Sequence, residues 1–286
     1  MLPINGMYIP LNGTIRVAKL TTGSRRLFYN KSLERALQIL CSFDFDRREQ
    51  TLTELVNSLG LPKSTTHRLV STLMDYHFLH YDPASQRYSL GLRIFGLGSV
   101  ADHSLSLKKL VGPFLTELHT KLNKTVALAV LRDDEVVYID KREDWRHPVK
   151  STEMGRHRPP HFGMFGHLFM AYLPDEEVDR ILRKTPLVGY TKKSITNKTE
   201  FKRRLRGIRN QGYVVDDGEV FDGVTGIAAP IEDATGSVVG GIGASLITAA
   251  ENAEGVKRII KELRETTKLV SEQLKAKARG SSSHNG

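Results

Sequence analysis

The chain has 286 residues, 40% of them hydrophobic, so it is long enough for about two domains with cores of their own. Basic residues outnumber acidic ones by 42 to 32, which favours a polyanionic partner without deciding between nucleic acid, anionic lipid and an acidic ligand. The single cysteine excludes an internal disulfide framework and a cysteine-rich zinc site. Because neither an apolar run of roughly 18 residues nor a leader-like N-terminus is evident, we expect a cytoplasmic protein.

The N-terminal segment, residues 1–27, shows no helical or strand period and contains several basic residues. We interpret it as a basic arm. Such an arm in front of a DNA-binding module can reach phosphates or the minor groove, so Arg25 and Arg26 are candidate DNA contacts. At the other end, residues 280–286 are small and polar, and we expect a disordered tail there.

Two helices are predicted next. Apolar residues at helical spacing indicate a helix over residues 31–42, and a second helix begins at Thr51. Thr51 and Glu54 fit a capping box, in which two side chains satisfy the free amides at a helix start. Gly60 marks the end of the second helix, because glycine tolerates the left-handed conformation that follows a helix.

A third helix follows, with Ser64 as its expected N-cap and Val70 and Leu73 on its inner face. Its other face has hydroxyls and arginine but few acids, which suits a helix lying against DNA phosphates and base edges. The turn-rich segment over residues 82–87 predicts a hairpin, which completes a winged helix-turn-helix. The alternative is a three-helix packing module with a solvated outer face. The expected DNA contacts are Lys63, Ser64, Thr65, Thr66 and Arg68 on the helix, and Gln86 and Arg87 on the wing.

The remaining sequence predicts a linker helix and a second domain. Helical spacing runs across residues 93–106, with interruptions expected near Gly96, Gly98 and the Gly112-Pro113 pair. A helix in this position often dimerises, and the alternative is a helix that packs on its own domain. Residues 107–279 mix predicted strands with amphipathic helices, which favours an α+β domain with helices on the faces of a sheet.

Several of these segments resemble one known family. The segment "KSLERALQIL", followed by "TLTELVNSLGLPKSTTHRLVSTLMDYHFL", resembles the DNA-binding domain of the IclR family of bacterial transcriptional regulators. The segments "RPPHFGMFGHLFMAYLP" and "GYVVDDGEVFDGVTGIAAPIEDATGSVVGGIGAS" resemble its effector-binding domain. The resemblance implies an α+β protein with a winged helix-turn-helix (28–92), a linker helix (93–106) and a GAF-like antiparallel sheet with flanking helices (107–279). It also implies homodimers or homotetramers on double-stranded operator DNA.

The resemblance further implies an effector pocket. The family usually has small residues where this chain has Met164 and Phe165, and often a lysine where it has His167. It often has cysteine at the position of Gly226 and serine at that of Gly243. We therefore expect a ligand other than glyoxylate, and one that is more apolar or aromatic. The expected effector-binding residues are Gly163, Met164, Phe165, Asp216, Gly226, Gly243 and Ser245.

The function implied is a ligand-responsive repressor of a catabolic operon, released or modulated by a small organic acid, aromatic acids included, without a cofactor. A metal-assisted hydrolase that uses His157, His161 and His167 with Asp216 is one alternative. The prolines between the first two histidines break the helical geometry that they would need, so we predict no metal site and no catalytic residue. A DNA-coating architectural protein without a ligand is the other alternative.

Overall fold

The computed structural model describes residues 30–103, 106–144 and 154–282. The expected basic arm, with Arg25 and Arg26, lies outside the described residues. The tail expected to be disordered over residues 280–286 is helical at residues 280–282, and residues 283–286 lie outside the described residues. The chain divides into two compact units between Leu105 and Ser106, and each unit is described by itself. Among the helices that the structure describes, none combines the length and the apolar character needed to cross a membrane.

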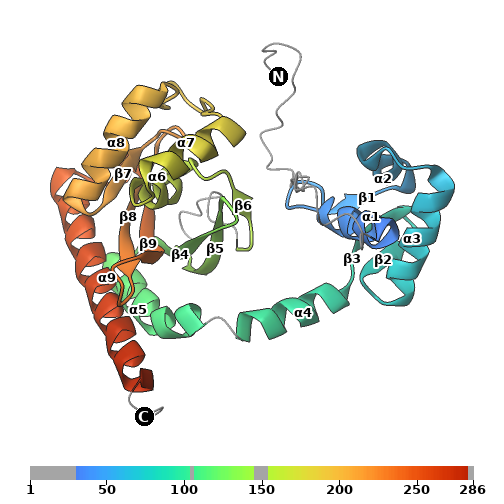
Figure 1. Cartoon of the computed structure of the whole chain (residues 1–286), viewed down its shortest axis with the longest axis horizontal. Coiled ribbons are helices and arrows are strands. Elements are labelled where there is room, and N and C mark those ends of the chain that lie inside the picture. Colours follow the sequence, from blue (N-terminus) through green and yellow to red (C-terminus); the bar gives the residue numbers. More distant parts are fainter. Residues whose placement is uncertain (1–29, 104–105, 145–153, 283–286) are drawn as a thin grey trace. The chain divides into compact units, whose positions relative to one another are not determined.

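The N-terminal unit consists of helices around a small sheet (Figure 1). The predicted capping box is confirmed, since the Thr51 hydroxyl accepts from the Glu54 amide and the Glu54 carboxylate accepts from the Thr51 amide. Gly60 has φ of 63° and ends the second helix, as predicted. The elements in chain order are α1 (Lys31–Cys41), β1 (Glu49–Gln50), α2 (Leu52–Leu59), α3 (Lys63–Asp75), β2 (Leu79–Asp82), β3 (Arg87–Leu90) and α4 (Leu92–His103).

The core of this unit joins the three predicted helices to the wing. Ile39 of α1, Leu55 of α2, Val70 of α3 and Leu79 of β2 are all buried in one apolar cluster. The strands are antiparallel in the order β1-β3-β2, so the wing hairpin β2–β3 gains a third, two-residue strand. That third strand was not predicted, because a two-residue segment is too short to show a period.

Two predictions about helix ends are wrong. The third helix begins two residues earlier than a Ser64 N-cap implies, at Lys63, and its N-cap is Pro62, which offers no side-chain hydrogen bond. Ser64 therefore lies in the first turn. The expected interruptions near Gly96, Gly98 and Gly112-Pro113 are also absent, because α4 continues through the first two and α5 (Ser106–Leu122) through the last pair.

The C-terminal unit is built on an antiparallel sheet of six strands in the order β6-β5-β4-β9-β8-β7. This α+β arrangement confirms the predicted fold class. Its elements are α5, β4 (Thr125–Arg132), β5 (Glu135–Arg142), β6 (His157–Arg158), α6 (Gly163–Ala171), α7 (Asp175–Lys184), α8 (Lys198–Gln211), β7 (Val214–Asp217), β8 (Val224–Glu232), β9 (Val238–Ile247), a 3-10 turn η2 (Thr248–Ala250) and α9 (Ala253–Ser282).

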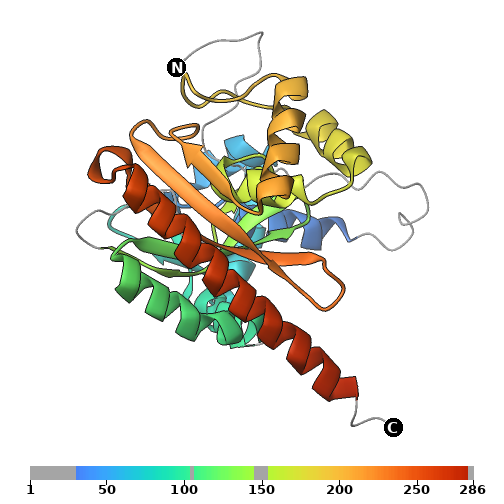
Figure 2. The same ribbon diagram turned by 90° about the vertical axis from the view of Figure 1, so that its left-hand side faces the viewer.

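Helices cover both faces of this sheet. Helix α9 crosses one face beside α5, whereas α6, α7 and α8 lie on the other (Figure 2). Side chains alternate between the faces along each strand, so Ile227 and Ala229 of β8 enter the α5–α9 core while Ala228 enters the α6 core. The face beneath α6 is made largely of small residues, and all nine residues of α6 are buried between this face and its neighbours, α8 among them.

Candidate DNA interface and effector site

The outer face of α3 is polar and accessible. Thr66, Val70 and Leu73 are the buried residues of this helix, which leaves its opposite side toward solvent. Lys63, Ser64, His67 and Arg68 are exposed, and Thr65 is half-buried. The first turn contains no acidic residue, so the free amides at this helix start can meet a phosphate without repulsion.

The prediction for Thr66 is wrong. This residue is 0% exposed, and its hydroxyl donates a 3.2 Å hydrogen bond to the carbonyl oxygen of Pro62. It lies four residues before Val70, on the same inward face of the helix, so its hydroxyl cannot reach a duplex. Sequence reasoning missed the exposed His67, although the same helical period places it on the outer face, three residues after Ser64.

The wing turn is organised by an acid. The Asp82 carboxylate accepts from the Ala84 and Ser85 amides and from the Ser85 hydroxyl, and these bonds lower its pKa. Gln86 follows with φ of 55° and is exposed at the tip. Arg87 turns toward the helical part of its unit, where its guanidinium lies 3.3 Å from the Glu49 carbonyl oxygen and 3.4 Å from the Glu54 carboxylate.

The seven expected effector residues lie together on the α6 face of the large sheet. Strand pairing places Asp216 of β7 beside Gly226 of β8, and Gly226 beside Ser245 of β9, so the three form one row across the sheet. Gly243 lies two residues before Ser245 and faces the same side. Helix α6 supplies the other three residues from its first turn, Gly163, Met164 and Phe165.

The first turn of α6 closes directly onto this row. A β-carbon built on Gly226 would lie 2.9 Å from the Met164 sulfur, and one built on Gly243 would lie 2.9 Å from the Phe165 ring. A β-carbon on Gly163 would lie 3.4 Å from the Asp216 carboxylate, which is an ordinary van der Waals distance. Gly226 and Gly243 are therefore places where large side chains from the first turn of α6 approach the sheet closely.

A buried polar cluster borders the same row. The Glu219 amide donates to Asp216 at 2.8 Å, the Glu219 carboxylate lies 3.2 Å from Arg204 of α8, and its second oxygen lies 3.5 Å from the Nδ1 atom of His167. Neither ring nitrogen of His161 has a hydrogen-bond partner, although this residue is only 4% exposed. Buried polar atoms without partners are rare in native proteins, so His161 is a place where a water or a ligand atom can bind.

Burial sets the protonation of this cluster. It raises the pKa of Asp216 to about 6, against the Glu219 amide and Arg204, which lower it. Burial, and then the neighbouring Asp216 charge, raise the pKa of Glu219 to about 7, while Arg204 acts in the opposite sense. Burial lowers the pKa of His161 to about 4 and that of His167 to about 3, so both imidazoles are neutral at physiological pH.

An aromatic group lies beside the start of α6. The Arg158 guanidinium stands 4.5 Å over the Phe162 ring, and that ring makes edge contacts with Tyr190 at 5.1 Å and with Phe221 at 6.1 Å between centroids. Arg158 is 6% exposed, whereas Phe221 is 37% exposed. Sequence reasoning missed this group, because its members come from separate segments and no local pattern connects them.

The histidines predicted as an alternative metal site do not form one. His157 lies on β6, where its Nδ1 atom is 2.7 Å from the Glu135 carboxylate, and this contact raises its pKa. His167 is instead buried beside Glu219, and His161 is buried close to His167. Across the described ranges, no group of three or more His, Cys, Asp and Glu side chains is arranged to hold a metal ion.

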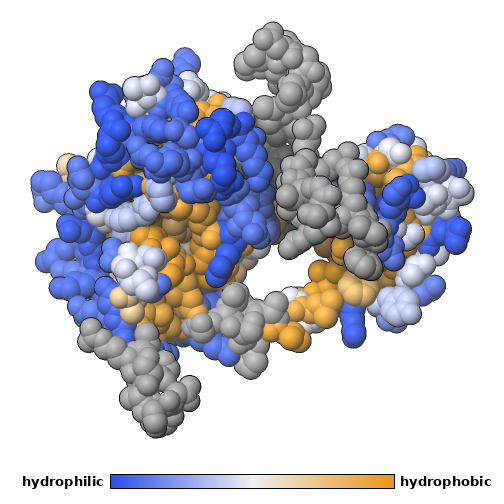
Figure 3. Space-filling model, in the orientation of Figure 1, coloured by the Kyte–Doolittle hydropathy of each residue, from blue (hydrophilic) through white to orange (hydrophobic). Residues whose placement is uncertain are grey.

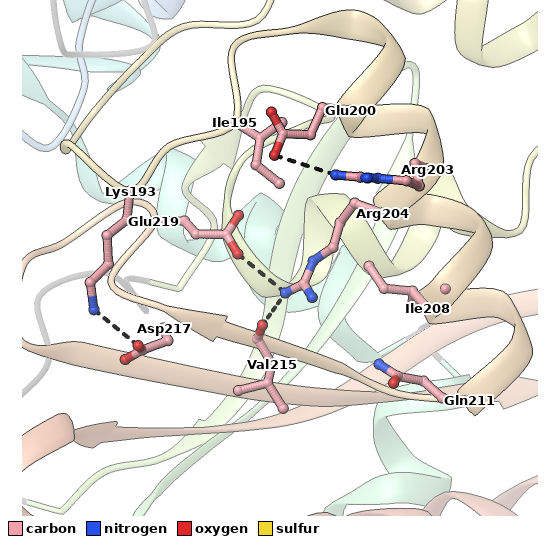
Figure 4. A pocket seen from close by; sticks show the side chains of 11 residues that line it. Lys193, Ile195, Glu200, Arg203, Arg204, Ile208, Gln211, Val215, Asp217 and Glu219 are labelled. Atoms are coloured by element: carbon pink, nitrogen blue, oxygen red, sulfur yellow. Dashed lines mark hydrogen bonds and ion pairs between the residues drawn. The ribbon is translucent and has the colours of Figure 1, made fainter.

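A separate surface pocket of about 590 Å³ lies between α8 and β7 (Figure 4). Arg204 reaches across it from α8 to the carbonyl oxygen of Val215 and to Glu219. Its charged lining is balanced, with Lys193, Arg203 and Arg204 facing Glu200, Asp217 and Glu219. None of the expected effector residues lines this pocket, and Glu219 is where it borders the buried polar cluster.

A winged helix-turn-helix with a cationic, hydroxyl-bearing outer face, followed by an α+β domain with a buried polar site, defines a ligand-responsive DNA-binding regulator. Residues 32–83 match the model of the IclR helix-turn-helix domain, and residues 100–272 match that of the bacterial transcriptional regulator IclR C-terminal domain. The chain therefore belongs to the IclR family of bacterial transcriptional regulators, as its motifs predicted.

Individual relatives agree. The transcriptional repressor IclR of Escherichia coli is 32% identical over 205 residues, which cover 71% of this chain and 75% of the relative. The crystal structure of an IclR-type regulator from Alicyclobacillus acidocaldarius has a TM-score of 0.76 and 31% identity, and the match covers 86% of this chain and 99% of that one. An IclR homolog from Microbacterium hydrocarbonoxydans, complexed with 4-hydroxybenzoate, has a TM-score of 0.75 and 25% identity over 85% and 98% of the two chains.

Proposed function

We propose that this regulator represses a catabolic operon by binding operator DNA through the outer face of α3, and that an aromatic acid releases it. The main support for DNA binding by α3 is that Lys63, Ser64 and Arg68 are exposed, while the apolar side of the helix is packed in the core. Arginine and hydroxyl groups on such a face can reach base edges and phosphates. Thr65, Gln86 and Arg87 extend this proposed interface, and Arg25 and Arg26 would add contacts from the N-terminal segment.

The effector half rests on the chemistry around Asp216 and Phe162. The Phe162, Tyr190 and Phe221 rings, with the Arg158 guanidinium over Phe162, offer faces and edges for a flat apolar body. Asp216 can accept a hydrogen bond from a ligand hydroxyl. A hydroxylated aromatic ligand suits both the rings and Asp216, and the relative that was crystallised with 4-hydroxybenzoate supports an aromatic acid as its class.

The regulator is proposed to act as a homodimer or a dimer of dimers through α4. Leu92, Phe95 and Val100 of this helix are 87%, 76% and 72% exposed, and apolar residues gather along it in Figure 3. An apolar helix face of this kind is covered in a stable protein, and a second copy of the same helix would cover it symmetrically. A two-fold dimer would read a palindromic operator, and a regulator of this kind acts in the cytoplasm, where the chromosome lies.

The enzyme alternative has little support. The geometry separates His157 from the buried His161 and His167, and the relative reported above is a transcriptional repressor. We therefore propose no catalytic residue.

The proposal is tested by selecting duplexes from a random pool with the full chain and measuring their affinity by fluorescence anisotropy. We expect one palindromic sequence to be enriched, its affinity to fall steeply with salt, and 4-hydroxybenzoate to release it. Acetate and succinate serve as aliphatic controls and should release little. Failure to enrich any sequence would overturn the DNA half. Equal release by aromatic and aliphatic acids, or by none, would overturn the aromatic effector.

A further inference from the structure

We propose that Met164 and Phe165 are specificity-determining residues that occupy the strand side of the effector pocket and confine the ligand to the side of Asp216 and Phe162. This inference rests on the proposed effector site and adds a limit on the shape of the ligand: the two side chains leave no room on the strand side for a second ring in line with the first. The limit follows from which surfaces the two side chains already cover.

The sheet beneath α6 has glycines at the positions where large side chains of the helix meet it. Three glycines on β8 and β9 lie against α6 side chains. The nearest side-chain contacts of built β-carbons would be 2.9 Å to Met164 at Gly226, 2.9 Å to Phe165 at Gly243, and 2.8 Å to Leu168 at Gly241. Real β-carbons do not come this close to neighbouring atoms, so the side chains occupy the space that any larger strand residue would need. A ligand atom cannot occupy that space either.

Two of these three contacts fall on the proposed site. Gly226 lies directly between Asp216 and Ser245 in the strand register, and a β-carbon on Gly243 would also lie 3.0 Å from the Met164 methyl carbon. Met164 thus spans both glycines and stands between the sheet and any ligand near Asp216. Leu168 makes the third contact, at Gly241, one helical turn farther along α6, and there it serves packing alone.

The side toward Asp216 is shaped differently. A β-carbon on Gly163 would have ordinary contacts, at 3.4 Å to the Asp216 carboxylate and 3.5 Å to Val220. Beyond it lies the ring group around Phe162, where Phe221 is 37% exposed and Tyr190 is half-buried. Met164 and Phe165, by contrast, are 5% and 1% exposed. A ligand therefore approaches along the aromatic side, and the Met164 side chain blocks it from reaching the strands.

The test enlarges the site at Met164. In the full chain, Met164→Ala removes the side chain that spans Gly226 and Gly243, and Leu168→Ala is the matched control one turn away. Binding of 4-hydroxybenzoate and of biphenyl-4-carboxylate is measured by isothermal titration calorimetry. We expect wild type to bind the single-ring acid and Met164→Ala to bind the two-ring acid at least about tenfold more tightly than wild type does. Leu168→Ala should show no such gain.

A second variant keeps the test decisive if the enlarged core folds poorly. Gly226→Ala alone should lower the melting temperature, because its β-carbon meets Met164. When Gly226→Ala is combined with Met164→Ala, its β-carbon no longer meets Met164, so much of the lost melting temperature should be recovered. The same β-carbon should refill part of the space opened by Met164→Ala and so reduce binding of the two-ring acid.

The outcomes separate the two proposals. Equal binding of the two-ring acid by wild type and Met164→Ala, or an equal gain in Leu168→Ala, overturns the steric role while single-ring binding still supports the effector class. Absence of binding of either acid to all variants overturns both. Binding that appears in Met164→Ala and not in wild type supports the steric role even if wild type takes neither acid.

Discussion

The amide of Glu219 donates a 2.8 Å hydrogen bond to the Asp216 carboxylate, which holds a carboxyl group at the end of β7 close to a second one on the turn that follows. Burial raises the pKa of Asp216 to about 6 and that of Glu219 to about 7, so both groups keep their protons more tightly in the folded chain than in the unfolded one. The stability that they contribute is therefore greatest at low pH and is lost as the pH rises through these values.

Asp216→Asn should remove the part of this pH-dependent loss of stability that comes from ionisation of Asp216. The amide oxygen of asparagine can still accept from Glu219, and it carries no charge to bury. Relative to wild type, the variant should gain stability between pH 4 and pH 7, by roughly 3 kcal/mol for a shift of about two pKa units. Urea unfolding of the C-terminal unit at several pH values measures this difference.

The two buried histidines, His161 and His167, make the stability of wild type change with pH in the opposite direction. Their lowered pKa values mean that their stability contribution is complete above about pH 6.5 and is lost as the pH falls toward 4 and 3. Because the variant keeps both histidines, they largely cancel in the comparison. An unchanged difference between variant and wild type at pH 5 and pH 8 would contradict the buried, protonated state of Asp216.

Arg68→Ala should weaken operator binding by about 1–3 kcal/mol if the guanidinium reads a base, and should reduce the salt dependence if it contacts a phosphate. Arg206→Ala, which removes an exposed arginine from α8 in the other unit, controls for net charge. Thr66→Val should leave DNA affinity nearly unchanged while costing about 1 kcal/mol of stability through the lost bond to Pro62. Anisotropy titrations at two salt concentrations separate these cases.

Two glycines of α8 should respond to alanine in opposite directions. Gly207 lies in the helix interior with open space around its α-carbon, so Gly207→Ala should stabilise the unit by about 0.5–1 kcal/mol. Gly212 ends the helix with φ of 77°, where alanine is strained, so Gly212→Ala should destabilise by roughly 1 kcal/mol or more. Thermal unfolding of both variants measures the pair, and shifts of the same sign would contradict these helix bounds.

Phe95→Glu should disrupt self-association, because it places a charge on the exposed apolar face of α4. We expect the variant to show a lower oligomeric state than wild type in sedimentation velocity. We also expect it to bind a palindromic duplex more weakly than wild type does. Arg93→Glu, on the same exposed helix, is a control for charge alone. If Phe95→Glu retains the wild-type assembly, α4 is not the proposed interface.

Local signals in the sequence predicted much of the fold. The capping box at Thr51, the turn at Gly60 and the wing hairpin each depend on residues a few positions apart, and the structure confirms them. The family motifs also located the row of Asp216, Gly226 and Ser245, which meet through strand pairing. Their role in binding an effector stays a prediction.

What the sequence did not predict depends on three-dimensional packing. Thr66 reads as one more hydroxyl in a polar run, and only its place four residues before the inward-facing Val70 marks it as buried. The contacts of Phe162 with Tyr190 and Phe221 join segments that no periodicity connects. The fit of Met164 against Gly226 requires the separation between helix and sheet, which a linear pattern does not contain.

In the free regulator, the wing cation Arg87 shares its charge with Glu54, the same carboxylate that closes the start of α2. A DNA phosphate that drew Arg87 away would leave Glu54 to attract a cation from solution, and the exchange would cost little because both side chains are exposed. Arg87 would then add less to the net release of counterions than Arg68, for which α3 provides no acidic neighbour in its first turn. The wing would thereby shape the geometry of the complex more than its ionic-strength dependence.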